Sequence, residues 1–169
     1  MADKVRMKTT RQTVLAEMIR KHGWKHGAEL GLWQGATFGY LLDTFPDLHL
    51  IGVDNWQAVG PYEGKEMRAS EMMVRQIVAR HWKRAEILKM STVEAASTVE
   101  NGSLDFVFVD ASHDTKSVLD DLDAWYPKVR AGGYMTGHDA NLPSVQAALD
   151  QSLLGWTRIE ANVWIYPCA

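Results

Sequence analysis

Short apolar runs alternate with longer amphipathic segments along most of the 169-residue chain. The runs have the length of β-strands, and the segments between them repeat apolar residues every three to four positions, as helices do. One face of the segment 67–84 carries Val74, Ile77, Val78, His81 and Trp82. Strands that alternate with helices in this way predict right-handed crossovers and a mostly parallel sheet with helices on both faces.

The predicted strands cover 28–32, 48–53, 85–90, 104–109, 134–136, 156–160 and 163–166. The predicted helices cover 36–44, 67–84, 114–126 and 144–153, with a first helix before Gly23 and a short one before Gly102. The first helix opens at Thr9 or Thr10. The spacing of a capping box, in which two residues at a helix start bond each other's backbone, occurs in Thr9 with Gln12 and in Ser91 with Glu94.

Only Ala161 and Asn162 separate the last two predicted strands, which is too short a link for a parallel crossover. We therefore expect a hairpin, with an antiparallel strand at the edge of the sheet. A chain of 169 residues can bury one large core but is too short for two ordinary domains. The predicted fold is a single α/β domain over residues 1–169, doubly wound and Rossmann-like, with about seven strands.

The charges are close to balance, with 18 Lys and Arg against 21 Asp and Glu. This balance gives no electrostatic reason to expect a nucleic-acid partner or a membrane surface. The single cysteine, Cys168, favours a reducing compartment, and no apolar run approaches the roughly 18 residues that a membrane span needs. We expect a soluble, cytoplasmic protein with no export signal.

Candidate chemistry gathers where the predicted strands end, because ligands of open parallel sheets bind beyond the carboxyl ends of the strands. The residues at these ends are 29–35, 54–56, 91–92, 110–113 and 138–139. Gly31 and Gly35 would let the backbone approach a ligand closely, or they form a plain turn between strand and helix. Their spacing, E-x-G-x-x-x-G, departs from the G-x-G-x-x-G of dinucleotide sites, so phosphate binding is less favoured.

Asp54 follows the second strand at the position where an acidic side chain binds ribose hydroxyls, although it could instead be a capping or solubilising residue. Two residues later, Trp56 could cover the face of an adenine or pack in the core. The ends of the first two predicted strands therefore favour a nucleotide-like ligand.

The chain carries four motifs: E-L-G with G-A-T at 29–37, I-G-V-D at 51–54, L-D-F-V-F-V-D at 104–110 followed by A-S-H at 111–113, and A-G-G at 131–133 before G-H-D at 137–139. In this order, the four motifs resemble those of class I S-adenosylmethionine-dependent methyltransferases, and in particular the small O-methyltransferase-like subgroup. The resemblance covers roughly residues 27–148. Two positions depart from the subgroup, which usually has tyrosine at Thr115 and often glycine at Ala111.

The resemblance implies a role for each matching residue. Gly31 and Gly35 would lie against the methionine part of the cofactor, with Glu29 near its amino group. Asp54 would bind the ribose and Asp110 would also contact the cofactor. The remaining cofactor-binding candidates are Asn55, Trp56 beside the adenine, and Ser91 and Thr92 near the adenine amine. The residues expected around the methyl acceptor, and hence the catalytic candidates, are Asp110, His113, His138 and Asp139.

A hydroxyl acceptor must lose its proton during methyl transfer, which calls for a base or a metal. The unperturbed pKa of the histidine side chain suits a base, which makes His113 and His138 candidates, although His113 could instead hold the start of a helix. Some relatives hold a divalent metal at positions that match Asp110, His138 and Asp139. Histidine in that set suits manganese or zinc better than magnesium, and His138 could equally be a base that Asp139 orients.

The resemblance thus implies S-adenosylmethionine as cofactor and transfer of its methyl group to a hydroxyl of a small molecule. Two alternatives are a nicotinamide-dependent oxidoreductase of the same fold and a non-catalytic module that binds S-adenosylmethionine. The first is disfavoured by the missing third glycine and the lack of an evident hydride-transfer pair. Only the loop 57–67 and the first helix could cover the acceptor, so a homodimer that closes the site is also expected.

Overall fold

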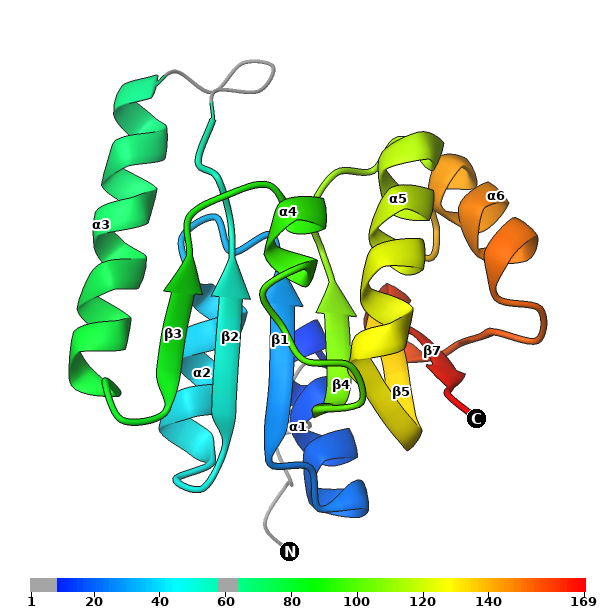
Figure 1. Ribbon diagram of the computed structural model, residues 1–169, viewed down its shortest axis with the longest axis horizontal. Coiled ribbons are helices and arrows are strands. Elements are labelled where there is room, and N and C mark those ends of the chain that lie inside the picture. The colour runs from blue at the N-terminus through cyan, green and yellow to red at the C-terminus, as the bar shows by residue number, and fades with distance from the viewer. Residues whose placement is uncertain (1–8, 58–63) are drawn as a thin grey trace, which may run out of the picture.

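The computed structural model describes residues 9–57 and 64–169, which form one seven-stranded sheet flanked by helices (Figure 1). Residues 58–63 of the expected loop 57–67 lie outside the described residues, and residues 64–67 belong to a helix and not to a loop. The strands are β1 (His26–Leu30), β2 (His49–Val53), β3 (Ala85–Leu88), β4 (Leu104–Val109), β5 (Val129–Gly137), β6 (Thr157–Arg158) and β7 (Trp164–Pro167). The α-helices are α1 (Arg11–His22), α2 (Ala36–Thr44), α3 (Gly64–Arg80), α4 (Thr92–Ala96), α5 (Thr115–Trp125) and α6 (Pro143–Ser152). Two short 3₁₀ helices, η1 (Tyr126–Lys128) and η2 (Glu160–Asn162), precede β5 and β7.

The strands lie in the order β3-β2-β1-β4-β5-β7-β6. The first five are parallel, and β7 pairs antiparallel with both β5 and β6. The predicted α/β class and the antiparallel hairpin at the C-terminal end are therefore confirmed. Within this hairpin, the two-residue β6 forms the edge of the sheet and β7 lies between β5 and β6.

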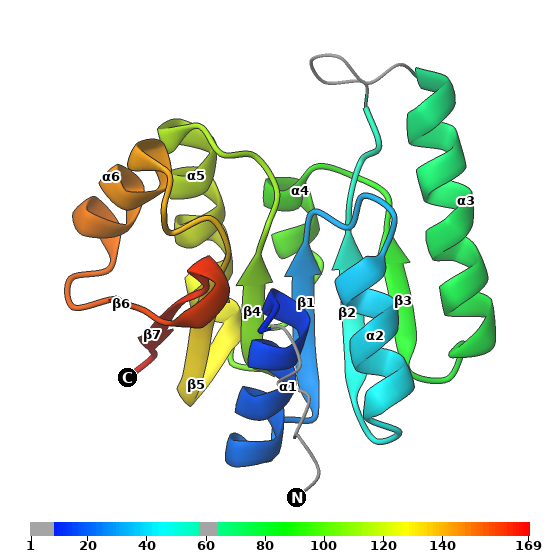
Figure 2. The same ribbon diagram turned by 180° about the vertical axis from the view of Figure 1, so that it is seen from behind.

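Helices cover both faces of the sheet, as the two opposite views show (Figures 1 and 2). One apolar cluster joins the sheet to α4, α5 and α6, and the other joins it to α1, α2 and α3. The strand β4 is buried along its whole length, as expected of a central parallel strand. This double cover leaves the carboxyl ends of the central strands as the place for a ligand.

Several element boundaries differ from the prediction for local reasons. The first helix is capped by Thr10, which forms its capping box with Thr13 instead of the expected pair one residue earlier. The helix α3 ends at Arg80, so Trp82 leaves the predicted apolar face and is 70% exposed. The predicted capping box of Ser91 and Glu94 is present, but α4 ends at Ala96, well before Gly102.

None of the helices within residues 9–57 and 64–169 is long and apolar enough to cross a membrane.

Candidate active site

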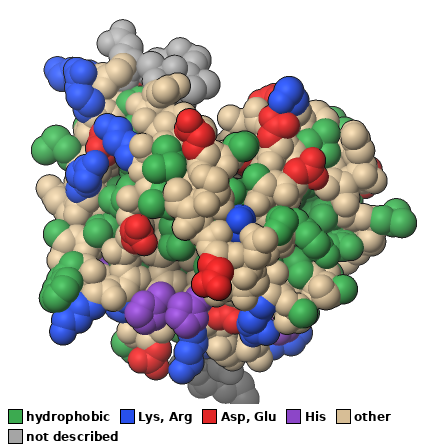
Figure 3. Space-filling model, viewed as in Figure 1, with side chains coloured by type: hydrophobic (Ala, Val, Ile, Leu, Met, Phe, Trp, Pro, Cys, Tyr) green, Lys and Arg blue, Asp and Glu red, His purple; other side chains and the backbone are tan. Residues whose placement is uncertain are grey.

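A cavity of about 860 Å³ opens at the carboxyl ends of β1, β2 and β4, where the site was expected. In the space-filling view the upper outline of the molecule is indented between the sides that carry α3 and α5 (Figure 3). Seven carboxyl side chains contribute to the wall of the cavity, and the described lining includes one arginine, Arg11. The carboxylates are Glu29, Asp54, Asp110, Asp114, Asp120, Asp121 and Asp139.

The turn after β1 brings the backbone close to the end of β4, and Gly31 makes this approach possible. Its φ is +85°, and a Cβ added there would lie 2.3 Å from the carbonyl oxygen of Asp110. Asp54 fixes the same turn, because its Oδ2 accepts hydrogen bonds of 2.9 Å from the backbone N–H groups of Leu32 and Trp33. The predicted close approach at Gly31 is thus a contact between two strand ends at the floor of the cavity.

Gly35 does not line the cavity. It precedes α2 with a φ of +75°, and an added Cβ would lie 2.9 Å from side-chain atoms of both Val74 and Ile77 on α3. The missing side chain therefore lets α2 and α3 pack closely. This position differs from the one expected for Gly35, against the methionine part of a cofactor.

Trp56 also lies away from the cavity wall, in the core cluster of α1, α2 and α3. Its indole Nε1–H donates a hydrogen bond of 2.9 Å to the carbonyl oxygen of Trp33, and only 6% of the residue is exposed. The packed interpretation of Trp56 fits these contacts. Its neighbour Asn55 does line the cavity, as does Trp33, which is 48% exposed.

Glu29 projects into the cavity from β1 and is almost fully buried. Its Oε2 is buried without a hydrogen-bond partner. Burial raises the pKa of this carboxyl well above its ordinary value, and the nearby carboxylate of Asp110 adds to the shift, while Arg11 opposes it. A buried acceptor of this kind suits a ligand that brings a positively charged donor.

Sequence reasoning missed Arg11. Its Nε donates a hydrogen bond of 3.2 Å to Thr37 Oγ1 on α2, and its Nη1 lies 3.4 Å from Asp110 Oδ2. Arg11 is the first residue of α1, where the positive end of the helix dipole disfavours a cation. That unfavourable placement is the signal in the sequence that could have marked it as a site residue.

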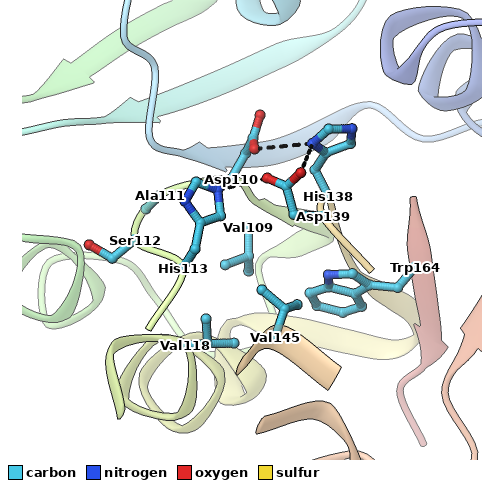
Figure 4. A pocket seen from close by; sticks show the side chains of 10 residues that line it. All are labelled: Val109, Asp110, Ala111, Ser112, His113, Val118, His138, Asp139, Val145 and Trp164. Carbon is cyan, nitrogen blue, oxygen red and sulfur yellow. Dashed lines mark ion pairs between the residues drawn. The ribbon is translucent and has the colours of Figure 1, made fainter. Parts of the chain in front are cut away.

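The four residues expected around the acceptor come together at the ends of β4 and β5 (Figure 4). His113 Nε2 lies 2.7 Å from Asp139 Oδ2. His138 Nδ1 lies 3.1 Å from Asp139 Oδ1 and 3.6 Å from Asp110 Oδ1. Burial disfavours a charged His138, but the two carboxylates outweigh it, so the pKa of His138 is raised above its ordinary value.

Three of these side chains form a set that could hold a metal ion. Ligand atoms of Asp110, His113 and Asp139 all lie within 4.8 Å of one another. This set differs from the predicted one, since His113 takes the place of His138. Asp139 has a φ of +56°, which residues other than glycine rarely adopt. In this conformation its carboxylate faces both histidines.

The far side of the cavity is formed by the starts of α4 and α5. Ser91 caps α4, and both Ser91 and Thr92 line the cavity as predicted. Asp121 of α5 lies beside Thr92, and its side chain takes part in a hydrogen bond with Thr92. The structure places Asp121 in the cavity wall as well.

Comparison with known proteins places this geometry in a family. A family model described as a methyltransferase domain matches residues 28–140. An uncharacterized protein of Acanthamoeba polyphaga mimivirus, R132, is 24% identical over 111 residues, which cover 66% of this chain and 49% of that protein. The chain therefore spans about half the length of this curated relative.

Solved structures share the fold. A candidate caffeoyl-CoA O-methyltransferase from Staphylococcus aureus superposes with a TM-score of 0.69 at 14% identity, covering 94% of this chain and 82% of that one. An O-methyltransferase family protein from Burkholderia thailandensis gives a TM-score of 0.66 at 15% identity, covering 94% of this chain and 55% of that one. At these identities the structures support the fold, and the family match rests on residues 28–140: the chain belongs to the methyltransferase-domain family.

Proposed function

We propose that this protein is an S-adenosylmethionine-dependent methyltransferase that transfers the methyl group to a hydroxyl of a small molecule. The observation that carries the proposal is the buried, unpartnered carboxyl oxygen of Glu29 in the wall of an acidic cavity of about 860 Å³. A cavity of this volume is large enough for a cofactor and part of an acceptor.

The charge of the cavity favours a cationic ligand over a dinucleotide. Seven carboxyl side chains and one arginine line it. S-adenosylmethionine carries two positive groups, a sulfonium and an ammonium, and one negative carboxylate. A nicotinamide dinucleotide carries two negative phosphates. The acidic wall therefore attracts the former and repels the latter, which argues against the oxidoreductase alternative.

The residues present fit the amino-acid part of the cofactor. Glu29 would accept a hydrogen bond from the ammonium group, while Arg11 and Thr37 would bind the carboxylate. Gly31 lets the turn after β1 pack against the backbone of Asp110, and this contact forms the floor on which the amino-acid part would lie. The fit supports an adenosyl amino acid as the ligand.

The nucleoside part would extend toward β2 and β3. Asp54 already accepts three backbone hydrogen bonds, from Leu32, Trp33 and Trp56. A carboxylate offers about four acceptor sites, so Asp54 can still accept one ribose hydroxyl. Asn55, Ser91 and Thr92 also line the cavity. In this arrangement Asn55 would lie beside the ribose, and Ser91 and Thr92 would lie toward the adenine.

When bound, the cofactor supplies an electrophilic methyl group, and the chain's own residues must align the acceptor oxygen and take its proton. His113 is the better base of the two histidines, because half of its side chain is exposed to an incoming acceptor. Asp139 holds its Nε2 at 2.7 Å and would stabilise the imidazolium that forms. His138, with its raised pKa, would balance the charge of Asp110 and Asp139.

The same cluster can also be read as a metal site, with Asp110, His113 and Asp139 as ligands. A mixed nitrogen and oxygen set suits manganese or zinc, which would lower the pKa of the acceptor hydroxyl. A melting experiment with Mn²⁺ separates the two arrangements. We expect no shift of the melting temperature, because His113 and Asp139 already satisfy each other. A saturable rise that Asp139→Asn abolishes would assign these residues as metal ligands instead.

A homodimer is part of the proposal, because two apolar side chains that line the cavity are about half exposed to solvent. Trp33 and Val93 line the cavity and are 48% and 47% exposed. A second subunit would bury them and cover the acceptor. Sedimentation equilibrium of the full chain tests this point, and a monomer at all concentrations would contradict it.

Mass spectrometry of the purified protein tests the proposed function. The protein is expected to carry S-adenosylmethionine or S-adenosylhomocysteine, and carried-over nicotinamide dinucleotide would contradict the proposal. Turnover separates the enzyme from a module that only binds the cofactor. A panel of hydroxylated small molecules should include one that produces S-adenosylhomocysteine with wild-type protein and far less with His113→Ala.

A further inference from the structure

Asp121 is a buried carboxyl in the cavity wall that the proposed methyl transfer does not use. The residue is 2% exposed, yet it contributes to the lining of the cavity. Burial raises its pKa to about 6, against the opposing effect of its hydrogen bond with Thr92. An ionised group in such a place costs stability in the empty protein, so a ligand that hydrogen-bonds to it would recover part of that cost.

Contacts between α4 and α5 fix the position of this carboxyl. The Trp125 indole Nε1–H on α5 donates a hydrogen bond of 2.9 Å to the carbonyl oxygen of Thr92, the first residue of α4. The side chain of Asp121 bonds the same residue. Asp121 is therefore held at the far side of the cavity, next to the residues that follow β3.

The order of the strands indicates which part of the ligand reaches this side. Glu29 and Gly31 lie at the end of β1 and Asp54 at the end of β2, while Thr92 follows β3. Since β3, β2 and β1 are neighbours in the sheet, a ligand with its amino acid at β1 and its ribose at β2 points its base toward β3. In this orientation the base would lie near Thr92 and Asp121, which line the same cavity.

We propose that Asp121 accepts a hydrogen bond from the exocyclic amine of the adenine and thereby selects adenine over a base with a carbonyl at that position. The inference rests on the proposed function. The amine can donate a hydrogen bond to the carboxylate. A carbonyl in its place cannot, because both groups are then hydrogen-bond acceptors that face each other in a buried site. Sites that hydrogen-bond a ligand group reject analogues that cannot pair with it, often by orders of magnitude.

The neighbouring Asp120 provides a matched control. It lies on the same helix and also lines the cavity, but its side chain is 45% exposed and pairs with Lys116. Asp120→Asn removes one negative charge from the cavity wall, as Asp121→Asn does. It does not remove a buried acceptor beside Thr92.

The test compares S-adenosylhomocysteine with S-inosylhomocysteine, in which a carbonyl replaces the amine, by isothermal titration calorimetry. Wild-type protein should prefer S-adenosylhomocysteine by about tenfold or more. Asp121→Asn, whose amide can donate to a carbonyl, should narrow or reverse the preference, and Asp120→Asn should retain it. A structural role alone would weaken both ligands equally and leave the ratio unchanged.

Each outcome bears on a different claim. If wild-type protein binds S-adenosylhomocysteine and Asp121→Asn keeps the wild-type ratio, the role of Asp121 is wrong and the proposed function stands. Equal affinity of the wild-type protein for both ligands overturns the role of Asp121 even if the variant does not fold. If wild-type protein binds neither ligand, the proposed function and this inference both fail.

Discussion

The carboxyl groups of Glu29 and Asp121 are both buried in the cavity wall. In the ligand-free protein, their ionisation does not stabilise the fold. Burial raises the pKa of both groups. Residues that lower the stability of the empty protein commonly persist where they bind a ligand. These side chains therefore link the stability of the protein to its proposed ligand.

Asp121→Asn should stabilise the ligand-free protein at neutral pH. The folded-state pKa of Asp121 is about 6, above the unfolded value of 3.8, so its ionisation opposes folding. The penalty is full above about pH 6 and vanishes as the pH falls below about 4. The shift corresponds to up to about 3 kcal/mol. Urea unfolding at pH 7.5 and pH 4 should show a gain for the variant at pH 7.5 and little at pH 4. An equal change at both values would contradict the role of this ionisation.

Arg11→Gln should weaken ligands that contain the amino-acid part and spare those that lack it. Loss of a charged hydrogen bond costs about 1.5–3 kcal/mol, or roughly 10- to 100-fold in affinity. Calorimetry with S-adenosylhomocysteine and with 5′-methylthioadenosine, which has no amino acid, measures the difference. Arg20→Gln is the control, because Arg20 lies on the same helix over the ring of Phe45. Equal losses for both ligands would remove Arg11 from the carboxylate site.

At the scale of elements, the ends of strands hold the site together. The turn after β1 contacts the end of β4 at Gly31, and Asp54 at the end of β2 bonds the backbone of the same turn. Three neighbouring strands thus fix one loop. The position of the loop depends on backbone contacts and not on the identity of its side chains.

Gly31→Ala should destabilise the protein far more than Gly102→Ala. Both glycines have positive φ, but a Cβ at Gly31 would lie 2.3 Å from the Asp110 carbonyl oxygen, whereas nothing lies within 4 Å of one at Gly102. Backbone strain alone costs about 1–2 kcal/mol for a residue with a side chain. The clash at Gly31 should raise the total above about 3 kcal/mol. Similar losses for both variants in urea unfolding would show that the contact of β1 with β4 is not tight.

Sequence patterns were sufficient to predict the helices and strands, and to locate the site at the strand ends, because both depend on local spacing. The periodicity of apolar residues indicates helices and strands, and parallel strands bring their carboxyl ends to one edge. The sequence did not determine where the first helix begins, because Thr9 and Thr10 could each cap it. The structure shows that Thr10 is the cap. The sequence also could not show that Gly35 and Trp56 face packed neighbours and not the cavity.

At the scale of the whole molecule, distant segments assemble the site. Arg11 contacts Thr37, 26 positions away, and Asp110, which follows β4. Asp121 meets Thr92 across two helices. Pairings of this kind depend on how the helices pack on the sheet, and no local pattern in the sequence encodes them. The acidic character of the cavity likewise emerges only from the assembled fold, because the chain as a whole is close to neutral.

The central claim is that this acidic cavity binds an adenosyl amino acid and not a dinucleotide. Isothermal titration calorimetry of the wild-type protein with S-adenosylhomocysteine and, separately, with NAD⁺ tests it most directly. We expect saturable binding of one S-adenosylhomocysteine per chain and no binding of NAD⁺ at the same concentrations. Binding of NAD⁺ without binding of S-adenosylhomocysteine would contradict it.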